Sequence, residues 1–534
     1  MCEKKNLHIQ LDENHDKEHA VWNRRSFLQA LGLAGAGSMV MGKIPVSAAT
    51  ITPLSKALAD SESDKILILI RLKGGNDGLN TIIPQYDYDK YANLRPTLKI
   101  EQNNSFLLSS DFRMPSYMDP LQTFWGEGKM KVVHGVGYPN QNLSHFSSAD
   151  IWSSAGDSGE VLKTGVFGRY HEGLYPDYLL NPPASPPAIQ IGSLSNLMFV
   201  GEQTGYAFSV ANIDQLSQIA ENGTAYDMQN LPSCDYGSQL GFMRSVNNST
   251  YNYASVINEA YDIATNDISY SRNNIAKQLA LIARLIKGNL GTKIYMVTLT
   301  GFDTHADQPT KHQKLMSDLT KAISDFYKDI ATQNRDKDVL AMTISEFGRR
   351  AKENASNGTD HGAASAMLLF GEGLDGNGFV GDHPDLNDLD KHGNTKFTMD
   401  FRDIYASILE NWLCIDSSIV DSALLNNYNR VNLGLKCSSS GIDDPGVNNG
   451  FKHYPIYSDE TVFVEFVLPN AMEVEVQLIN ILGQNIGVVH KERYLPGTHR
   501  VNLNPQFKRY TPGQYIYRIF AEGNSYSKSI ILAK

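Results

Sequence analysis

Residues 66–78 read Ile-Leu-Ile-Leu-Ile-Arg-Leu-Lys-Gly-Gly-Asn-Asp-Gly. The nearly continuous apolar run over residues 66–72 indicates a strand that is covered on both faces, as the central strands of parallel sheets are. The glycines that follow let the backbone turn tightly and approach a ligand, and Asp77 presents a carboxylate there. In open parallel sheets the carboxyl ends of the strands form the ligand-binding edge, so this turn predicts one part of such an edge.

The same strand pattern recurs further along the chain, in Lys131–Val136, Lys293–Leu299, Val339–Ile344 and Ala366–Phe370. Between these runs, Asn274–Lys287 and Thr310–Ala331 carry apolar residues at helical spacing. Strands that alternate with helices favour an α/β fold with a doubly wound, mainly parallel sheet. We assign this domain to residues 60–437.

The C-terminal part of the sequence has a different pattern. Residues 438–451 are rich in Ser, Gly, Asp, Asn and Pro, which predicts a linker. Residues 452–534 predict a small β-sandwich, because half-buried alternation with turn signals recurs in Val462–Leu468, Glu473–Ile479, His499–Leu503, Gln514–Phe520 and Ser527–Ala533.

Length and composition restrict the class of protein. The chain has 534 residues, which is more than one core usually serves, and its 41% hydrophobic residues are ordinary for a globular protein. The net charge of −11 gives no reason to expect nucleic acid as a partner. The 4 cysteines exclude a disulfide framework, although one bridge such as Cys414–Cys437 stays open in an oxidising compartment.

The N-terminus has the parts of an export signal. Arg24 and Arg25 precede a glycine-rich apolar run from Ala30 to Met41, and small residues follow up to Ala48. The run is shorter than the roughly 20 residues that a membrane-spanning helix needs. Residues 1–48 therefore predict a twin-arginine signal peptide, with an amphipathic helix of the mature protein as the alternative. No later stretch predicts a transmembrane segment in the mature chain.

Polar clusters follow the predicted strands, and they include the side chains that bind metals or do chemistry. Any one of them alone is usually structural: the Gly-Gly-Asn-Asp-Gly turn can be a plain tight turn, and Ser144 can be an N-cap instead of a nucleophile. Together they predict a shared site for divalent metal ions at one edge of the sheet. The candidate residues are Asp77, Ser144, Asp303, His305, Glu346, Arg349, Asp360, His361 and His383.

Seven short motifs give these residues a family context. The sequence resembles the family called domain of unknown function 1501 over roughly residues 20–420, through the twin-arginine leader, Gly74-Gly75-Asn76-Asp77-Gly78-Leu79-Asn80-Thr81, Ser144-His145-Phe146, Asp303-Thr304-His305, Ser345-Glu346-Phe347-Gly348-Arg349, Thr359-Asp360-His361-Gly362 and Asp400-Phe401-Arg402. That family is similar to the alkaline-phosphatase and sulfatase superfamily, whose members hold two divalent metals around a nucleophile.

This resemblance implies an alkaline-phosphatase-like fold, with Ser144 as the nucleophile. Glu346, which stands where the superfamily would place an Asp-His pair, and Arg349, whose guanidinium fits an anion, are further catalytic candidates. The metal ligands would be Asp77, Asp303, His305, Asp360, His361 and His383, holding Zn, Mg, Ca or Mn. Asp303 and His305 are closer in sequence than the superfamily's usual first pair of ligands.

The tail from Tyr454 resembles the C-terminal sorting domain of the type IX secretion system, through Ile479-Asn480-Ile481-Leu482-Gly483-Gln484, Leu495-Pro496-Gly497 and Gly513-Gln514-Tyr515-Ile516-Tyr517-Arg518. The twin-arginine translocase and the type IX machinery would then be partners. We expect the protein to pass through the periplasm and to reach the cell surface or the medium.

Two functions fit these observations. One is a metal-dependent hydrolase in which the metal and Ser144 act on a phosphate or sulfate ester and an arginine such as Arg349 holds the anion. The other is a non-catalytic surface protein on the same fold, which binds a glycan or a partner complex. Convergence of the candidate ligands in space would favour the first function.

Overall fold

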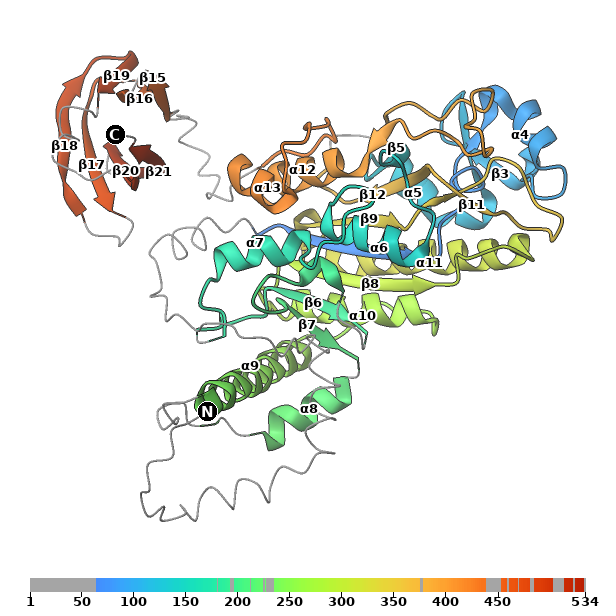
Figure 1. Cartoon of the computed structure of the whole chain (residues 1–534), viewed down its shortest axis with the longest axis horizontal. Coiled ribbons are helices and arrows are strands. Elements are labelled where there is room, and N and C mark those ends of the chain that lie inside the picture. The colour runs from blue at the N-terminus through green and yellow to red at the C-terminus, as the bar shows by residue number, and fades with distance from the viewer. Residues whose placement is uncertain are drawn as a thin grey trace. The chain divides into compact units, whose positions relative to one another are not determined.

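The computed structural model describes residues 64–179, 181–192, 196–211, 213–223, 226, 235–374, 378–437, 453–458, 461–468, 470–480, 485–502, 513–521 and 524–532. The predicted signal peptide and linker lie outside these residues. The described chain divides into two compact units, one within residues 64–437 and one within residues 453–532. Figure 1 labels their helices and strands.

One mixed sheet forms the centre of the first unit. Its strand order is β13-β5-β12-β9-β1-β8-β6-β7, and β14 also pairs with β5. The strands are β1 (Ile66–Lys73), β5 (Met130–Gly137), β6 (Ala188–Ile191), β7 (Ala207–Val210), β8 (Ile294–Thr300), β9 (Val339–Ser345), β12 (Ser365–Phe370), β13 (Gly378–Val380) and β14 (Met399–Asp400). All five strands that we predicted for this domain are confirmed within about two residues of their predicted bounds.

Most neighbouring strands of this sheet are parallel. The first predicted strand, β1, lies at its centre and pairs in parallel with both β8 and β9. The exception is β12, which is antiparallel to both β5 and β9. Between β9 and β12 the chain makes only the short hairpin of β10 (Gly348–Arg349) and β11 (His361–Gly362) and has no crossover helix, so it returns in the opposite direction.

The two faces of the sheet are buried under different helices, which explains why β1 is apolar without interruption over Ile66–Ile70. Ile66, Ile68 and Ile70 pack into the core that includes residues of α10 and α11. Leu67 and Leu69 pack into the core that includes residues of α6, α7, α12 and α13. Because side chains alternate along a strand, a strand covered on both faces needs apolar residues at every position.

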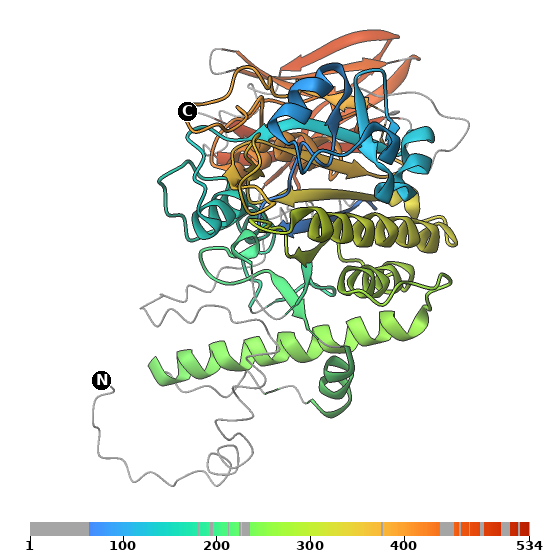
Figure 2. The ribbon, with the colours of Figure 1, turned by 90° about the vertical axis from the view of Figure 1, so that its right-hand side faces the viewer.

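The helices lie in layers on these two faces. Figure 1 shows α12 and α13 on one side of the sheet and α10 on the other, and Figure 2 shows α11 and α10 stacked beneath the strands. Their bounds are α4 (Tyr88–Leu94), α5 (Pro120–Gly126), α6 (His145–Ser154), α7 (Val166–Leu174), α8 (Ile213–Asn222), α9 (Asp235–Ile263), α10 (Asn274–Lys287), α11 (Gln308–Ala331), α12 (Phe401–Asn411) and α13 (Ser417–Leu424). The predicted α/β fold with a mainly parallel sheet is confirmed.

The second unit is a small antiparallel β-structure. One sheet has the order β15-β16-β19 and the other the order β18-β17-β20-β21. Both contribute to one core, in which Val464 and Phe466 of the first sheet join Val474, Val476 and Tyr517 of the second. The strands are β15 (His453–Ser458), β16 (Thr461–Leu468), β17 (Met472–Asn480), β18 (Asn485–Tyr494), β19 (Gly497–Asn502), β20 (Gly513–Ala521) and β21 (Asn524–Leu532). The predicted β-sandwich is confirmed.

A disulfide joins Cys414 to Cys437, with Cα atoms 5.2 Å apart, at the end of the first unit. It ties the chain just after α12 to the last described residue before the predicted linker.

None of the described helices combines the length and hydropathy that a membrane crossing requires.

Candidate metal centre

A cluster of histidines and carboxylates lies at the carboxyl ends of β8 and β9. Asp303 and His305 stand in the loop between β8 and α11, and Glu346 directly follows β9. Asp360 and His361 come from the β10–β11 hairpin. His145 is the first residue of α6, in the segment that follows β5. Parallel strands end at the same edge of a sheet, so residues far apart in sequence meet here.

The Asp303 carboxylate is the centre of this cluster. Its Oδ1 lies 3.1 Å from Nε2 of His305 and 3.1 Å from Nε2 of His361. These two nitrogens are 3.0 Å apart. The second oxygen, Oδ2, is 3.4 Å from Nε2 of His145. Three imidazole nitrogens therefore converge on one carboxylate.

The other ring nitrogen of each histidine faces a fixed acceptor. Nδ1 of His145 is 2.7 Å from Oε2 of Glu346, and Nδ1 of His305 is 3.2 Å from Oδ1 of Asp360. Nδ1 of His361 is 2.9 Å from the carbonyl oxygen of Leu143. Acceptors at all three Nδ1 atoms assign the proton of each neutral ring to Nδ1 and leave the Nε2 lone pairs directed at the centre.

This geometry fits a metal ion. Metal–ligand bonds of about 2.1 Å place neighbouring ligand atoms about 3.0 Å apart in an octahedral site and about 3.4 Å apart in a tetrahedral one. The observed separations among Asp303, His305 and His361 are 3.0 to 3.1 Å. His145, Asp303 and His361 also offer ligand atoms that all lie within 4.8 Å of one another. Without a cation between them, the lone pairs on the three Nε2 atoms would face the Asp303 carboxylate at 3.1 to 3.4 Å and repel it.

The ligand types narrow the choice of metal. Imidazole nitrogens suit Zn, Fe, Cu and Ni, whereas Mg and Ca prefer shells made only of oxygen. A set of three imidazoles and one carboxylate therefore favours a transition-metal ion over the Mg or Ca that the sequence left open. Such a set also leaves room for a further ligand on the exposed side.

Asp303 is ionised and open to solvent. Partial burial raises its pKa, but the hydrogen bond from Arg349 and the positive charge of that guanidinium outweigh this effect and lower the pKa to about 2. Its side chain is 46% exposed, and that of His305 is 45% exposed. The pKa of His361 is lowered, mainly by burial, which favours the neutral form that binds metals.

Arg349 holds Asp303 in place and is not available to a substrate. Its guanidinium is fully buried and donates to Oδ1 of Asp303 at 2.8 Å. The same group donates to the backbone carbonyls of Gly75, Thr359 and Phe302, at 2.9 to 3.0 Å, and to that of Gly74. The predicted role of Arg349 as an anion clamp is therefore replaced by a positioning role.

Glu346 is also a positioning residue. Its side chain is 2% exposed, with Oε2 on His145 and Oε1 3.3 Å from the guanidinium of Arg71. Burial between these two partners leaves the carboxylate no access to a substrate, so the predicted direct catalytic role does not fit. Glu346 fixes the ring of His145 instead.

Asp77 does not belong to the metal centre, although the sequence placed it there. Its carboxylate is buried and accepts hydrogen bonds from Nη1 of Arg95 at 2.7 and 2.9 Å. The backbone N–H groups of Leu79 and Asn80 and the side-chain amide of Gln308 also donate to it. Burial raises the pKa of Asp77, but the charge of Arg95 outweighs this and lowers it. Both oxygens are used, so Asp77 is a buried brace.

His383 also lies elsewhere. Its Nδ1 is 3.1 Å from the hydroxyl of Tyr86, and its ring packs against those of Phe112 and His134. Burial lowers the pKa of His383 to about 4. The sequence motif Gly-Asp-His-Pro therefore marks an aromatic cluster and not a late metal ligand.

Ser144 is the N-cap residue of α6 and directly precedes His145. It is exposed, and its side chain makes no cap hydrogen bond. The sequence pattern predicted a role for this serine but not for the neighbouring His145. The signal for His145 is its position at the start of a helix that follows a buried strand and a short loop.

The sequence was compared with known proteins. No curated protein matches it. Among solved structures, a protein of the alkaline phosphatase superfamily from Vibrio parahaemolyticus is 9% identical over 90% of this chain and 88% of that one, with a TM-score of 0.30. The PsFucS1 sulfatase from Pseudoalteromonas sp. is 10% identical over 86% and 89%, with a TM-score of 0.29.

A family comparison covers part of the first unit. The matched segment runs from α9 to α13 and contains Asp303, His305, Asp360 and His361, but not His145. Over residues 246–422, this chain matches the family described as protein of unknown function (DUF1501).

Proposed function

We propose that the protein is an exported metal-dependent hydrolase that acts on phosphate or sulfate esters. The observation that carries this proposal is the set of three histidine Nε2 atoms directed at Asp303, each ring fixed through its Nδ1. A transition-metal ion bound there would polarise the ester and lower the pKa of the attacking group, which is Ser144 or a water molecule. In such centres the ring nitrogen that does not bind the metal typically donates to a carboxylate or a backbone carbonyl, as Nδ1 does in all three histidines here.

The residues of the site would have two kinds of role, binding the ion and orienting the histidine rings. Asp303, His145, His305 and His361 would bind the ion directly. Asp360, Glu346 and the carbonyl of Leu143 would orient the rings. A substrate would approach from the side where Asp303 and His305 are nearly half exposed.

Two further groups stand where a substrate would bind. Arg350 is 41% exposed and lies 3.7 Å from Asp360, so it is a cation that an ester anion could reach. Ser144 is exposed beside His145 and stays the proposed nucleophile, with water as its competitor. A Ser144→Ala variant separates them, because full activity in this variant would assign the attack to water.

The second candidate is a non-catalytic surface protein that binds its metal for structure or for ligand recognition. One observation favours it: Glu346 and Arg349, which the sequence predicted as catalytic, are both used to orient ligands. A binding protein needs no proton donor for a leaving group. The two candidates therefore differ in turnover and not in metal content.

We also propose that the chain is exported by the twin-arginine pathway and passes the outer membrane through type IX secretion. The support is the Arg24-Arg25 leader and the resemblance of the tail to a sorting domain. Export could be followed with a Lys-Lys replacement of the arginine pair and with a deletion of residues 452–534. Unchanged delivery to the medium in both variants would exclude the proposal.

The function is tested by metal analysis and an ester panel on the full chain. Wild-type protein should retain about one transition-metal ion per chain and hydrolyse at least one phosphate or sulfate ester, and His145→Ala and His361→Ala should lose both. Lys314→Met, on the exposed face of α11, is the matched control. Bound metal without turnover would support the binding protein, and a folded protein that takes up no metal would refute both candidates.

A further inference from the structure

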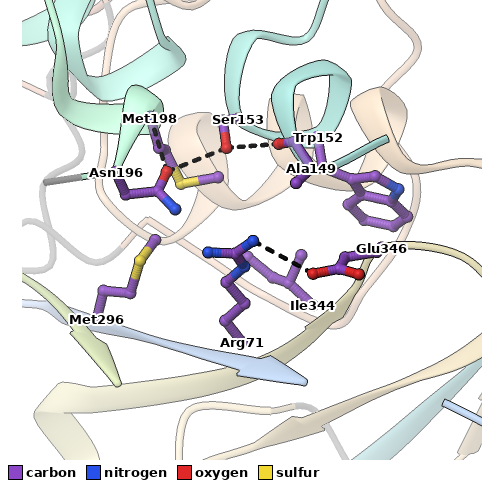
Figure 3. A pocket seen from close by; sticks show the side chains of 9 residues that line it. All are labelled: Arg71, Ala149, Trp152, Ser153, Asn196, Met198, Met296, Ile344 and Glu346. Atoms are coloured by element: carbon purple, nitrogen blue, oxygen red, sulfur yellow. Dashed lines mark hydrogen bonds and ion pairs between the residues drawn. The ribbon is translucent and has the colours of Figure 1, made fainter. Parts of the chain in front are cut away.

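An arginine lies on the central strand of the sheet, beside the metal centre. Arg71 is on β1 and follows Leu67 and Leu69 on the face that α6, α7, α12 and α13 cover. Its backbone partner on β9 is Ile344. Glu346 comes two residues after Ile344, so its side chain leaves the chain on the same face. The two neighbouring strands therefore bring Arg71 and Glu346 together, as Figure 3 shows.

The Arg71 guanidinium is directed at this one carboxylate. Nη2 of Arg71 donates to Oε1 of Glu346 at 3.3 Å, and no other acceptor for the guanidinium is found in the described part of the chain. The Arg71 side chain is 23% exposed, whereas that of Glu346 is 2% exposed. Water therefore has little access to the carboxylate, and its oxygens depend on donors from the protein.

The second oxygen of Glu346 determines which nitrogen of His145 carries the proton. Oε2 of Glu346 lies 2.7 Å from Nδ1 of His145. An ionised carboxylate can only accept, so this contact holds the ring proton on Nδ1 and leaves the Nε2 lone pair directed at Asp303. A donor in the place of Oε2 would move the proton to Nε2, and the ring could then no longer bind an ion through that atom.

We propose that Arg71 is a positioning residue of the metal centre. By donating to Oε1 of Glu346 it turns the carboxylate so that Oε2 accepts from His145, which keeps Nε2 of His145 free for the ion. Glu346 lies between the two side chains, so Arg71 acts through this carboxylate and not on the ion itself. The effect on metal binding rests on the proposed function, whereas the effect on the ring proton of His145 does not.

The backbone of Glu346 holds α6 independently of this side chain. Its carbonyl oxygen accepts from the hydroxyl of Ser148, which lies one turn after His145 in α6. We therefore expect the start of α6 to stay docked when Arg71 or the Glu346 side chain is changed. A change at His145 in such variants then reports the orientation of the side chain of residue 346.

The test compares the ring proton of His145 in two variants, Glu346→Gln and Arg71→Met/Glu346→Gln. In Glu346→Gln, Arg71 should draw the amide oxygen to itself, so that the amide nitrogen donates to Nδ1 of His145 and the proton moves to Nε2. The added Arg71→Met change frees the amide to turn its oxygen to His145, which should return the proton to Nδ1. Proton–nitrogen correlation spectra of the metal-free full chain, labelled in histidine, measure this directly, and His145→Ala assigns the signal.

Metal affinity gives a second measurement. Glu346→Gln should bind a transition-metal ion about 10- to 100-fold more weakly than wild type, as loss of an outer-shell partner typically does. The double variant should bind it more tightly than Glu346→Gln, so the second substitution should offset the first. Arg430→Met/Glu346→Gln is the matched control, because Arg430 pairs with Glu410 and Asp421, and it should bind no more tightly than Glu346→Gln.

A ring proton that stays on Nδ1 in Glu346→Gln, or that stays on Nε2 in the double variant, would overturn the proposal. The double variant leaves no buried charge without a partner, so the test does not depend on the fold of Arg71→Met alone. If wild-type protein takes up no metal, the proposed function fails, whereas the spectra of the metal-free protein still decide the role of Arg71.

Discussion

Removal of the Asp360 carboxylate should weaken metal binding without affecting the fold. In the structure, Oδ1 of Asp360 accepts from Nδ1 of His305 at 3.2 Å and from the amide of Asn354 at 3.3 Å. Its Oδ2 is 3.7 Å from Arg350. Neither oxygen of Asp360 is among the atoms that meet at the centre of the cluster, which are Oδ1 of Asp303 and the Nε2 atoms of His305 and His361. We therefore expect Asp360 to affect metal binding through the ring of His305.

The size of the effect follows from this arrangement. Loss of a second-shell partner of a metal-binding histidine typically costs about 10- to 100-fold in metal affinity, which we expect for Asp360→Ala. Asp360→Asn keeps an oxygen that can accept from His305 and should cost less. The side chain is 45% exposed, and an ion pair as exposed as that with Arg350 contributes at most about 1 kcal/mol. The free energy of unfolding of the metal-free protein should therefore change little.

A double-mutant cycle tests the mechanism directly. Metal affinity would be measured by competition with a chromophoric chelator for wild type, Asp360→Ala, His305→Ala and the double variant. If Asp360 acts only through His305, the double variant should bind metal as weakly as His305→Ala alone. Additive losses would show that Asp360 contacts the ion itself, and wild-type affinity in Asp360→Ala would refute the second-shell assignment.

Three further changes should affect stability. Arg95→Met leaves the Asp77 carboxylate buried without its counter-ion, which should cost about 3 to 5 kcal/mol in urea unfolding, whereas Lys314→Met at an exposed pair should cost less than about 1 kcal/mol. Burial lowers the pKa of His171 in the folded protein to about 3. Between pH 6.5 and 3 the unfolded chain therefore binds a proton at this residue that the folded protein does not. The free energy of unfolding decreases as the pH is lowered through this window, by up to about 1.4 kcal/mol per pH unit. His171→Leu should flatten this part of the pH profile, and parallel profiles would contradict the assignment. Cys414→Ser opens a disulfide across 23 residues and should cost about 3 kcal/mol, and an equal melting temperature with and without reductant would exclude that contribution.

The apolar pattern predicted the sheet because it reports burial directly. Strands such as β1 and β9 are covered on both faces, so apolar residues run continuously over Ile66–Ile70 and Val339–Met342 instead of alternating with polar ones. The helix predicted over Asn274–Lys287 from apolar spacing is confirmed to the residue, and the structure shows Asn273 as its N-cap and Gly288 after its last turn. The direction of β12 could not be read in this way, because a covered strand is apolar whether its neighbours are parallel or antiparallel.

The candidate site was predicted in part. Asp303, His305, Asp360 and His361 meet because the loops after strands of one sheet end at one edge, which topology alone requires. Asp77 follows the central strand in the same way, but its carboxylate is occupied by hydrogen bonds from Arg95. No local sequence pattern predicts that contact. Contacts between segments that lie far apart in sequence decide which carboxylate remains free, and these contacts follow from packing and not from local pattern.

Three carboxylates at this edge of the sheet each meet an arginine, and the exposure of the pair separates their roles. Asp77 and Arg95 are both almost fully buried, so every oxygen lone pair is used inside the protein and the pair can only brace the turn. Glu346 is equally buried but is shared between Arg71 and His145, so the one carboxylate positions both of these side chains. Asp303 alone combines a buried arginine with a side chain that is nearly half exposed. The arginine keeps that carboxylate ionised and in place, and its exposed side is open to the metal ion and the ester of the proposed function.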